Sequence, residues 1–357
     1  MHETTTRPRR NAFRARVNLG DGEAMRVSMA GQSRGEDPRI GTPKSRASAS
    51  VAHGLLQLLL SVSFLAPIPV GAQQVPDTLF QPKVTPPAFA AAKGPRIGID
   101  EAHHNFHTAI GRYRPFARLA ERDGYRIIRV TGALTDQRLS GIDLLVIANP
   151  LNAVNDGDNW SLPTPSAYTP DEVKAVRRFV ERGGALLLIA DHMPFAGAAE
   201  ALGAAFDVRY YNGYAQTADA TSIFTLRRGS TLRPHPVTDG RSAAERIDSL
   251  VVFTGSAFGL LKNGAAVLSL PSDTRVLLPS TAWVFTASTP SVSSDGLLYG
   301  AALTVGAGRV FVAGEAAMFS AQRSGPQGDG LMGFNRPSAS QNAQFALNVL
   351  HWLTRVF

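Results

Sequence analysis

The sequence predicts an α/β fold: a flavodoxin-like three-layer sandwich around a mostly parallel, doubly wound sheet, with a β-rich C-terminal half. Three short, almost continuous apolar runs are the first observation, because strands covered on both faces of a parallel sheet have this pattern. The second observation is that helical patterns separate these runs, as in α/β domains. The third is a second half in which strand patterns follow one another closely.

The central strands are expected at the three apolar runs, residues 96–100, 143–150 and 185–192. A helix is expected at 111–124, where Phe116 and Leu119 would face the sheet. The clearest helical pattern covers 169–184. Thr169 and Glu172 there form a capping box, and an apolar stripe follows until two glycines end the helix.

Strands of the second half are expected at residues 249–256, 265–270, 274–279, 281–287 and 296–316. The last of these segments contains Gly306-Ala307-Gly308, which indicates a hairpin turn. The chain closes with a helical pattern at 338–357, in which His351 is expected at the surface or an edge.

Residues 1–72 are interpreted as a leader with a secretory signal. An apolar run at 54–70 follows a basic segment, and small residues at 70–72 mark a cleavage site for signal peptidase. An uncleaved anchor is the alternative, since about 17 apolar residues approach the lower limit for crossing a bilayer. Residues 73–95 are interpreted as a proline-rich linker and 96–357 as a single domain. A periplasmic or secreted protein is therefore expected.

Composition excludes several classes of function. The net charge is +8, but residues 1–53 hold 10 Lys and Arg against 5 Asp and Glu, which leaves only +3 on the rest. A nucleic-acid partner is therefore not expected. The chain has no cysteine, which excludes disulfides and thiolate chemistry. No nucleotide cofactor is expected, because no phosphate-binding fingerprint follows a predicted strand.

Polar residues gather where the predicted strands end. In an open α/β sheet, ligands bind outside the carboxyl ends of the strands, so these residues form the candidate site. Four are candidate catalytic residues: His103, His107, Asp191 and Glu315. Five are candidate ligand-binding residues: Asp100, Glu101, His104, Asn149 and His192.

A divalent metal, Zn²⁺ or Mn²⁺, is a candidate cofactor. His103 and His107 are four residues apart and would share a face if their segment opens a helix. Asp191 would complete a ligand set of imidazoles and a carboxylate. The structural alternatives stay open: the histidines can cap strand and helix ends, and Asp191 can cap the helix expected after Pro194. That helix start could instead hold an anion.

Five segments carry a resemblance to a known family: "DEAHHNFH", "IADHMPFAGAAEALGAAFDV", "HPVTDG", "FVAGEAAMFS" and "QNAQFALNVLHWL". From about Arg96 onward the chain resembles the class I glutamine amidotransferase-like superfamily, in the branch of the GldG periplasmic domain, the GIFT domain and DUF4350 proteins. The resemblance implies a flavodoxin-like sandwich. Amidotransferases of the superfamily use a cysteine, which this chain lacks, so that activity is not expected.

The leading hypothesis is an exported domain whose polar pocket binds a small polar ligand, with carbohydrate as one candidate class, and hydrolyses it with metal assistance. The GldG and GIFT relatives look like binding or scaffold modules. The alternative hypothesis is therefore a non-catalytic interaction module with a protein partner in the envelope.

Overall fold

A computed structural model describes residues 24–25, 74–84, 86–157, 159–262, 264–325 and 327–357. The apolar run at 54–70 and the cleavage site after it lie outside these residues, so the export signal stays a prediction. Within the described residues, the helices are too short or too polar to cross a membrane.

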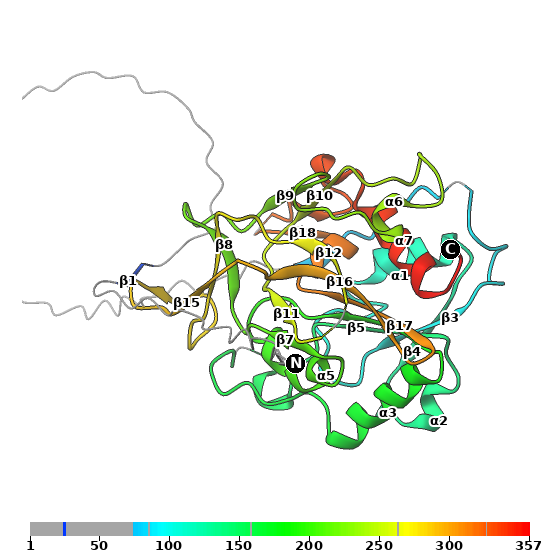
Figure 1. The fold of residues 1–357 in the computed structure, drawn as a ribbon, viewed down its shortest axis with the longest axis horizontal. Coiled ribbons are helices and arrows are strands. Elements are labelled where there is room, and N and C mark those ends of the chain that lie inside the picture. The colour runs from blue at the N-terminus through cyan, green and yellow to red at the C-terminus, as the bar shows by residue number, and fades with distance from the viewer. Residues whose placement is uncertain (1–23, 26–73, 85, 158, 263, 326) are drawn as a thin grey trace, which may run out of the picture.

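A large twisted sheet forms the centre of the domain (Figure 1). Its described strands are β3 (Arg96–Asp100), β4 (Arg126–Val130), β5 (Leu144–Ala148), β6 (Ala185–Ile189), β7 (Val208–Tyr210), β11 (Phe258–Leu260), β12 (Ala265–Ser269), β16 (Leu298–Val305) and β17 (Gly308–Ala313). The order is β4-β3-β5-β6-β17-β16-β11-β7, with β12 beside β16. From β4 to β17 neighbouring strands pair parallel, and the later pairs are antiparallel. The parallel part thus has the doubly wound order of flavodoxin-like folds, which confirms the predicted fold class.

Helices cover both faces of the sheet. One face carries α1 (Arg114–Arg122) and α7 (Asn342–Leu353), whose Phe116 and Phe345 belong to one apolar core. The other face carries α2 (Asp136–Leu139), α3 (Pro170–Glu181) and α5 (Glu200–Ala204), which pack in a second core. Alternate strand residues point to opposite cores, so the central strands are apolar on both faces.

Local signals explain where the helices begin and end. The predicted capping box of α3 is present, with Thr169 and Glu172 satisfying each other's backbone amides. At the end of α1, Gly124 adopts a positive φ of 94°. A side chain there would also collide with the backbone of Phe89, so only glycine fits this position.

The C-terminal half is β-rich, as predicted. Smaller sheets contain β8 (Tyr214–Thr217), β13 (Thr274–Leu277) and β15 (Ser291–Ser293); β9 (Phe224–Arg227) and β10 (Ser249–Val252); β2 (Val75–Pro76), β18 (Ala321–Ser324) and β19 (Gly330–Gly333); and β1 (Ala24–Met25) with β14 (Phe285–Thr286). The short helical elements are α4 (Phe195–Ala198), α6 (Pro236–Asp239), η1 (Ala153–Asn155), η2 (Ala317–Phe319) and η3 (Pro337–Ala339). The hairpin at Gly306 joins β16 to β17. Of the strand expected at 281–287, only the two residues of β14 form a strand. Trp283, just before them, adopts a positive φ of 65°, which interrupts the extended backbone.

The segment predicted as a linker, 73–95, packs on the domain over its described residues. β2 pairs antiparallel with β18, and the rings of Phe80 and Phe89 lie against the core that contains α1 and α7. Further along, the backbone amide of Ala88 donates to Asp123 Oδ1 at 2.7 Å. The folded unit therefore begins before Arg96, and this segment is part of it.

The prediction for His351 was wrong. The residue is 1% exposed, and its Nε2 lies 2.6 Å from Asp123 Oδ2. Asp123 is itself fully buried and accepts the amide of Ala88. The pair thus joins α7, the end of α1 and the docked segment before β3. Helical spacing placed His351 on a polar face, but in the fold that face lies against the end of α1.

Replacing Asp123 with alanine is expected to lower the free energy of unfolding by about 3–5 kcal/mol, because His351 and the Ala88 amide would lose a buried partner. Chemical denaturation followed by circular dichroism measures the loss. Replacing the exposed Asp273 with alanine is the matched control and is expected to change stability by less than about 0.5 kcal/mol. Equal effects of the two substitutions would contradict the anchoring role of Asp123.

Candidate functional site

The candidate residues lie at one edge of the sheet. β3, β5, β6 and β17 are successive neighbours and run parallel, so their carboxyl ends meet there. Asp100 closes β3, Asn149 follows β5, Asp191 follows β6 and Glu315 follows β17. The structure divides the predicted residues at this edge into two groups.

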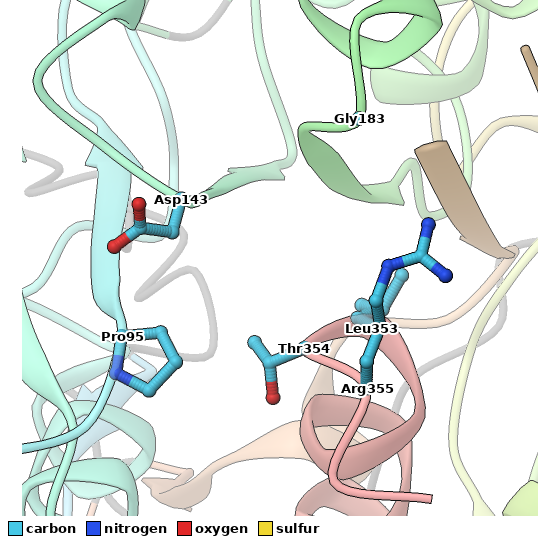
Figure 2. Close-up of a pocket in the computed structure, with 6 residues that line it drawn as sticks. All are labelled: Pro95, Asp143, Gly183, Leu353, Thr354 and Arg355. Carbon is cyan, nitrogen blue, oxygen red and sulfur yellow. The ribbon is translucent and has the colours of Figure 1, made fainter. Parts of the chain in front are cut away.

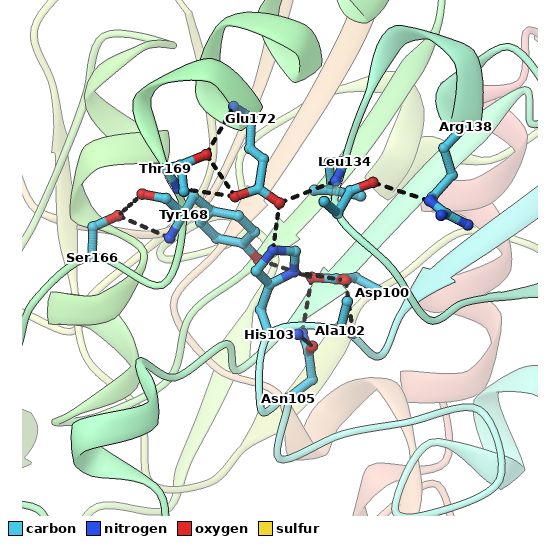
Figure 3. Close-up of polar contacts among 11 residues, drawn as sticks. Asp100, Ala102, His103, Asn105, Leu134, Arg138, Ser166, Tyr168, Thr169 and Glu172 are labelled. Carbon is cyan, nitrogen blue, oxygen red and sulfur yellow. Dashed lines mark hydrogen bonds and ion pairs between the residues drawn. The ribbon is translucent and has the colours of Figure 1, made fainter.

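The first group surrounds His103 (Figure 3). His103 Nδ1 lies 2.9 Å from both carboxylate oxygens of Asp100, and Nε2 lies 2.9 Å from Glu172 Oε1. Tyr168 and Asn105 donate to the same Asp100 oxygen, at 3.0 and 3.2 Å. Both nitrogens of the imidazole thus face carboxylates, and a carboxylate can only accept. The network predicts a protonated His103.

The electrostatics of this group agree with the geometry. Burial by itself lowers the pKa of His103, but the contacts with Asp100 and Glu172 outweigh burial and raise it. Burial by itself raises the pKa of Glu172, but hydrogen bonds from Thr169, His103 and Leu134 lower it to about 2. His103 therefore holds the loop after β3 against the start of α3. With both nitrogens engaged, it presents no lone pair to a ligand or a metal.

Glu101 and His104 also have structural partners. Glu101 accepts the amide of Ala109 at 2.8 Å and pairs with Arg129 at 2.7 Å. His104 lies near the surface and contacts Asp156 at 2.7 Å, with a positive φ of 44°. These contacts fix the loop from 101 to 109.

The second group surrounds Asp191. Asn149 Oδ1 accepts the Asp191 amide at 2.9 Å, and Asn149 Nδ2 donates to Asp191 Oδ2 at 3.5 Å. The amide of His192 donates to Asp191 Oδ1 at 2.7 Å, and the backbone of Ala316 also hydrogen-bonds Asp191. Asn149 adopts a positive φ of 52°, a strained conformation that is often found at functional sites.

Glu315 forms a buried carboxyl pair with Asp191. Glu315 is fully buried, and its oxygens accept the amides of Ala317 and Met318 at 2.6 and 2.9 Å. Burial and the nearby charge of Asp191 raise the pKa of Glu315 well above its usual value. Burial also raises the pKa of Asp191. Glu315 thus holds a proton more firmly than an ordinary carboxyl, and Asp191 is the more exposed member of the pair.

His107 lies close to this second group and not to His103. It is buried, and burial together with the charges of Arg112 and His192 lowers its pKa well below the usual value. Its Nε2 contacts Gln322 Nε2 at 3.1 Å. Its Nδ1 has no hydrogen-bond partner among the described residues. His107 is therefore a neutral imidazole in the wall of the site.

Aromatic rings that the sequence analysis did not assign surround His192. Its imidazole stacks on Tyr214, with 4.9 Å between ring centroids and 12° between planes. Trp283 meets the same imidazole at 4.7 Å, and Phe195 and Trp160 lie at 5.4 and 6.1 Å. Trp283 is 41% exposed. The sequence analysis did not assign Trp283 to the site because residues 281–287 have an ordinary strand pattern. That pattern does not reveal the positive φ of Trp283.

The predicted metal ligands are not brought together. In the described part of the chain, no three His, Asp or Glu side chains form a group that could hold one metal ion. His103, His107 and Asp191 all belong to that part. The two nitrogens of His103 face Asp100 and Glu172, so the set predicted from the sequence does not fit a metal.

A separate pocket of about 170 Å³ lies at the opposite, amino edge of the sheet (Figure 2). Its lining residues are Pro95, Asp143, Gly183, Leu353, Thr354 and Arg355. Asp143 is paired with Arg96, and Arg355 donates to the carbonyl of Ala307. The charged groups of this pocket are thus already satisfied.

Comparisons with known proteins concern the fold of the chain and not its activity. No family model matches the sequence, and no curated protein matches it. Solved structures do match. The mmIFT52 N-terminal domain is 16% identical with a TM-score of 0.49, covering 72% of this chain and 97% of that one. A ThuA-like protein from Bacteroides uniformis ATCC 8492 is 14% identical with a TM-score of 0.41, covering 76% and 94%. A cytoplasmic protein from Salmonella typhimurium LT2 is 13% identical with a TM-score of 0.44, covering 72% and 99%. At these scores the assignment of the fold rests on strand order alone.

Replacing His103 with glutamine is expected to remove a pH-dependent part of the stability. A histidine whose pKa is raised on folding contributes fully below its unfolded pKa of 6.5, and the contribution is lost as the pH rises through the folded pKa. The stability difference between the wild type and the variant should therefore be largest below about pH 6.5 and should shrink as the pH rises above it. Urea unfolding across this range measures it.

The neighbouring substitution His104→Gln serves as the control, because that imidazole and its partner Asp156 are exposed. It is expected to change stability little at any pH. A difference between the wild type and His103→Gln that stays constant with pH would show that folding does not raise the pKa of His103.

Proposed function

We propose that the protein binds a small polar ligand of the carbohydrate class at the carboxyl edge of the sheet, beside Asp191 and His192. The observation that carries the proposal is the position of an exposed Trp283 next to a buried polar group. Sugars present a C–H face that packs on aromatic rings and an edge of hydroxyl groups that hydrogen-bond to carboxylates and imidazoles. Trp283 supplies the ring, and Asp191 and His192 supply the polar partners.

The backbone geometry supports the same location. Trp283 and Asn149 both adopt positive φ values, which cost energy for residues other than glycine. Such strain persists where the surroundings hold a residue in place, and it is concentrated at ligand sites. The secretory signal predicted within residues 1–72 supports an envelope or extracellular location for this binding.

Hydrolysis of the bound ligand is the second candidate function, favoured by the carboxyl pair. A carboxyl whose pKa is raised by burial can donate a proton near neutral pH, and its partner can act as a base. Asp191 is the member that a ligand would touch, and Glu315 would position it and share its proton. The metal assistance expected from the sequence has no ligand set among the described residues, so the acid and base roles are assigned to these carboxyls.

Binding can be followed through tryptophan fluorescence and calorimetry with a panel of neutral oligosaccharides. Replacing Trp283 with alanine is expected to weaken binding by about tenfold, the value of one aromatic contact. Asp191→Asn should weaken binding at least as strongly, because it removes a charged acceptor.

Trp352→Phe is the matched control, since Trp352 packs against Arg309 at the start of β17, at the other edge of the sheet. It should leave the affinity unchanged. Absence of binding by every oligosaccharide would refute the carbohydrate proposal. The remaining explanation would then be the interaction module, with the polar edge as a surface for a protein partner.

A further inference from the structure

We infer that the ligand of this edge is electrically neutral and binds by donating hydroxyl protons to His192 Nε2 and Asp191. The inference rests on the proposed binding function and narrows its substrate class. It predicts that neutral sugars are preferred over sugar acids and sugar phosphates of the same size.

The tautomer of His192 is set by the protein. Its Nδ1 lies 2.6 Å from the carbonyl oxygen of Met193, and a carbonyl can only accept, so Nδ1 carries the hydrogen. Tyr214 donates to the same carbonyl at 3.1 Å and also stacks on the imidazole, which fixes the orientation of the ring. In the neutral imidazole, Nε2 then carries the lone pair and is an acceptor.

Nε2 is the atom of this ring that remains for a ligand. No described residue forms a hydrogen bond with it, and it is not among the fully enclosed polar atoms that lack a partner. The surrounding rings of Trp160, Phe195, Tyr214 and Trp283 cover the rest of the imidazole. An acceptor with one open direction, enclosed by aromatic rings, suits a hydroxyl group attached to an apolar ring face.

The carboxylate nearby is also an acceptor of hydrogen bonds. Asp191 is an acceptor whose oxygens lie next to His192. A hydroxyl group can donate to an acceptor of either kind, the imidazole nitrogen or the carboxylate oxygen.

The arginine whose charge acts on this group is already engaged by other partners. It is Arg112, whose charge acts on His107 together with that of a protonated His192. Its guanidinium lies 3.6 Å from the centroid of the Phe106 ring and donates to the carbonyls of Gln74 and Phe106. The helix that begins at Phe195 has only four residues and supplies no anion site. The carboxyl pair of Asp191 and Glu315 would repel a phosphate or a carboxylate.

Calorimetry of the wild-type protein tests the charge preference with matched probes. Each neutral di- or trisaccharide that binds is compared with its uronic acid and its 6-phosphate. The neutral sugar is expected to bind at least about tenfold more tightly, since an unpaired charge beside a carboxylate costs more than one ordinary hydrogen bond. Equal or tighter binding of the charged sugars overturns the inference, while the proposed binding function stands.

Two substitutions of His192 test the acceptor role. His192→Gln keeps an acceptor oxygen near the position of Nε2 and should retain most of the affinity. His192→Phe keeps the ring stack but removes the acceptor, and should lose about tenfold or more. Thermal denaturation establishes that both variants are folded, and the comparison of charged and neutral sugars does not depend on them. Unchanged affinity in folded His192→Phe would overturn the role of Nε2. If no sugar of any charge binds, the proposed function itself fails and the inference fails with it.

Discussion

The burial of two carboxyl groups, Asp191 and Glu315, at neighbouring strand ends is the constraint on which the rest of this edge depends. Because β6 and β17 run parallel, both chains leave the sheet at the same edge and bring their acidic residues together. An ionised carboxylate away from water is costly unless donors surround it. Backbone amides supply those donors: Ala317 and Met318 for Glu315, and His192 for Asp191. The remaining cost of burial raises the pKa of both carboxyls.

The same edge contains a second buried acidic network, in which the cost of burying the carboxylates is offset in a different way. Asp100 and Glu172 are also buried, but His103 lies between them and donates one ring N–H to each carboxylate. That network is closed: each polar atom of the imidazole has a carboxylate partner, and the loop after β3 is fixed to the start of α3. Closure makes the first group a structural element. The second group has an open acceptor at His192 and an exposed Trp283, and it is therefore the part of the edge that can bind.

Much of the fold was accessible from the sequence because it depends on local patterns. The apolar runs of β3, β5 and β6 and the capping box of α3 each identify an element without reference to the rest of the chain. The general rule for strand ends then located the edge. Contacts between residues distant in the sequence could not be predicted from such local patterns. His103 and His107 are four residues apart but point to different groups, because their loop does not form a helix. His351 was placed at the surface because the pattern does not reveal its buried contact with Asp123. Trp283 has a strand-like pattern, and only its positive φ marks it.

A crystal structure of the protein soaked with a neutral oligosaccharide tests the central claim most directly, since it locates the ligand without reference to activity. We expect density for a sugar ring against Trp283, with hydroxyl groups within hydrogen-bond distance of His192 Nε2 and an Asp191 oxygen. Density at the amino edge instead, in the pocket beside Asp143 and Arg355, would contradict the claim that the carboxyl edge is the binding site.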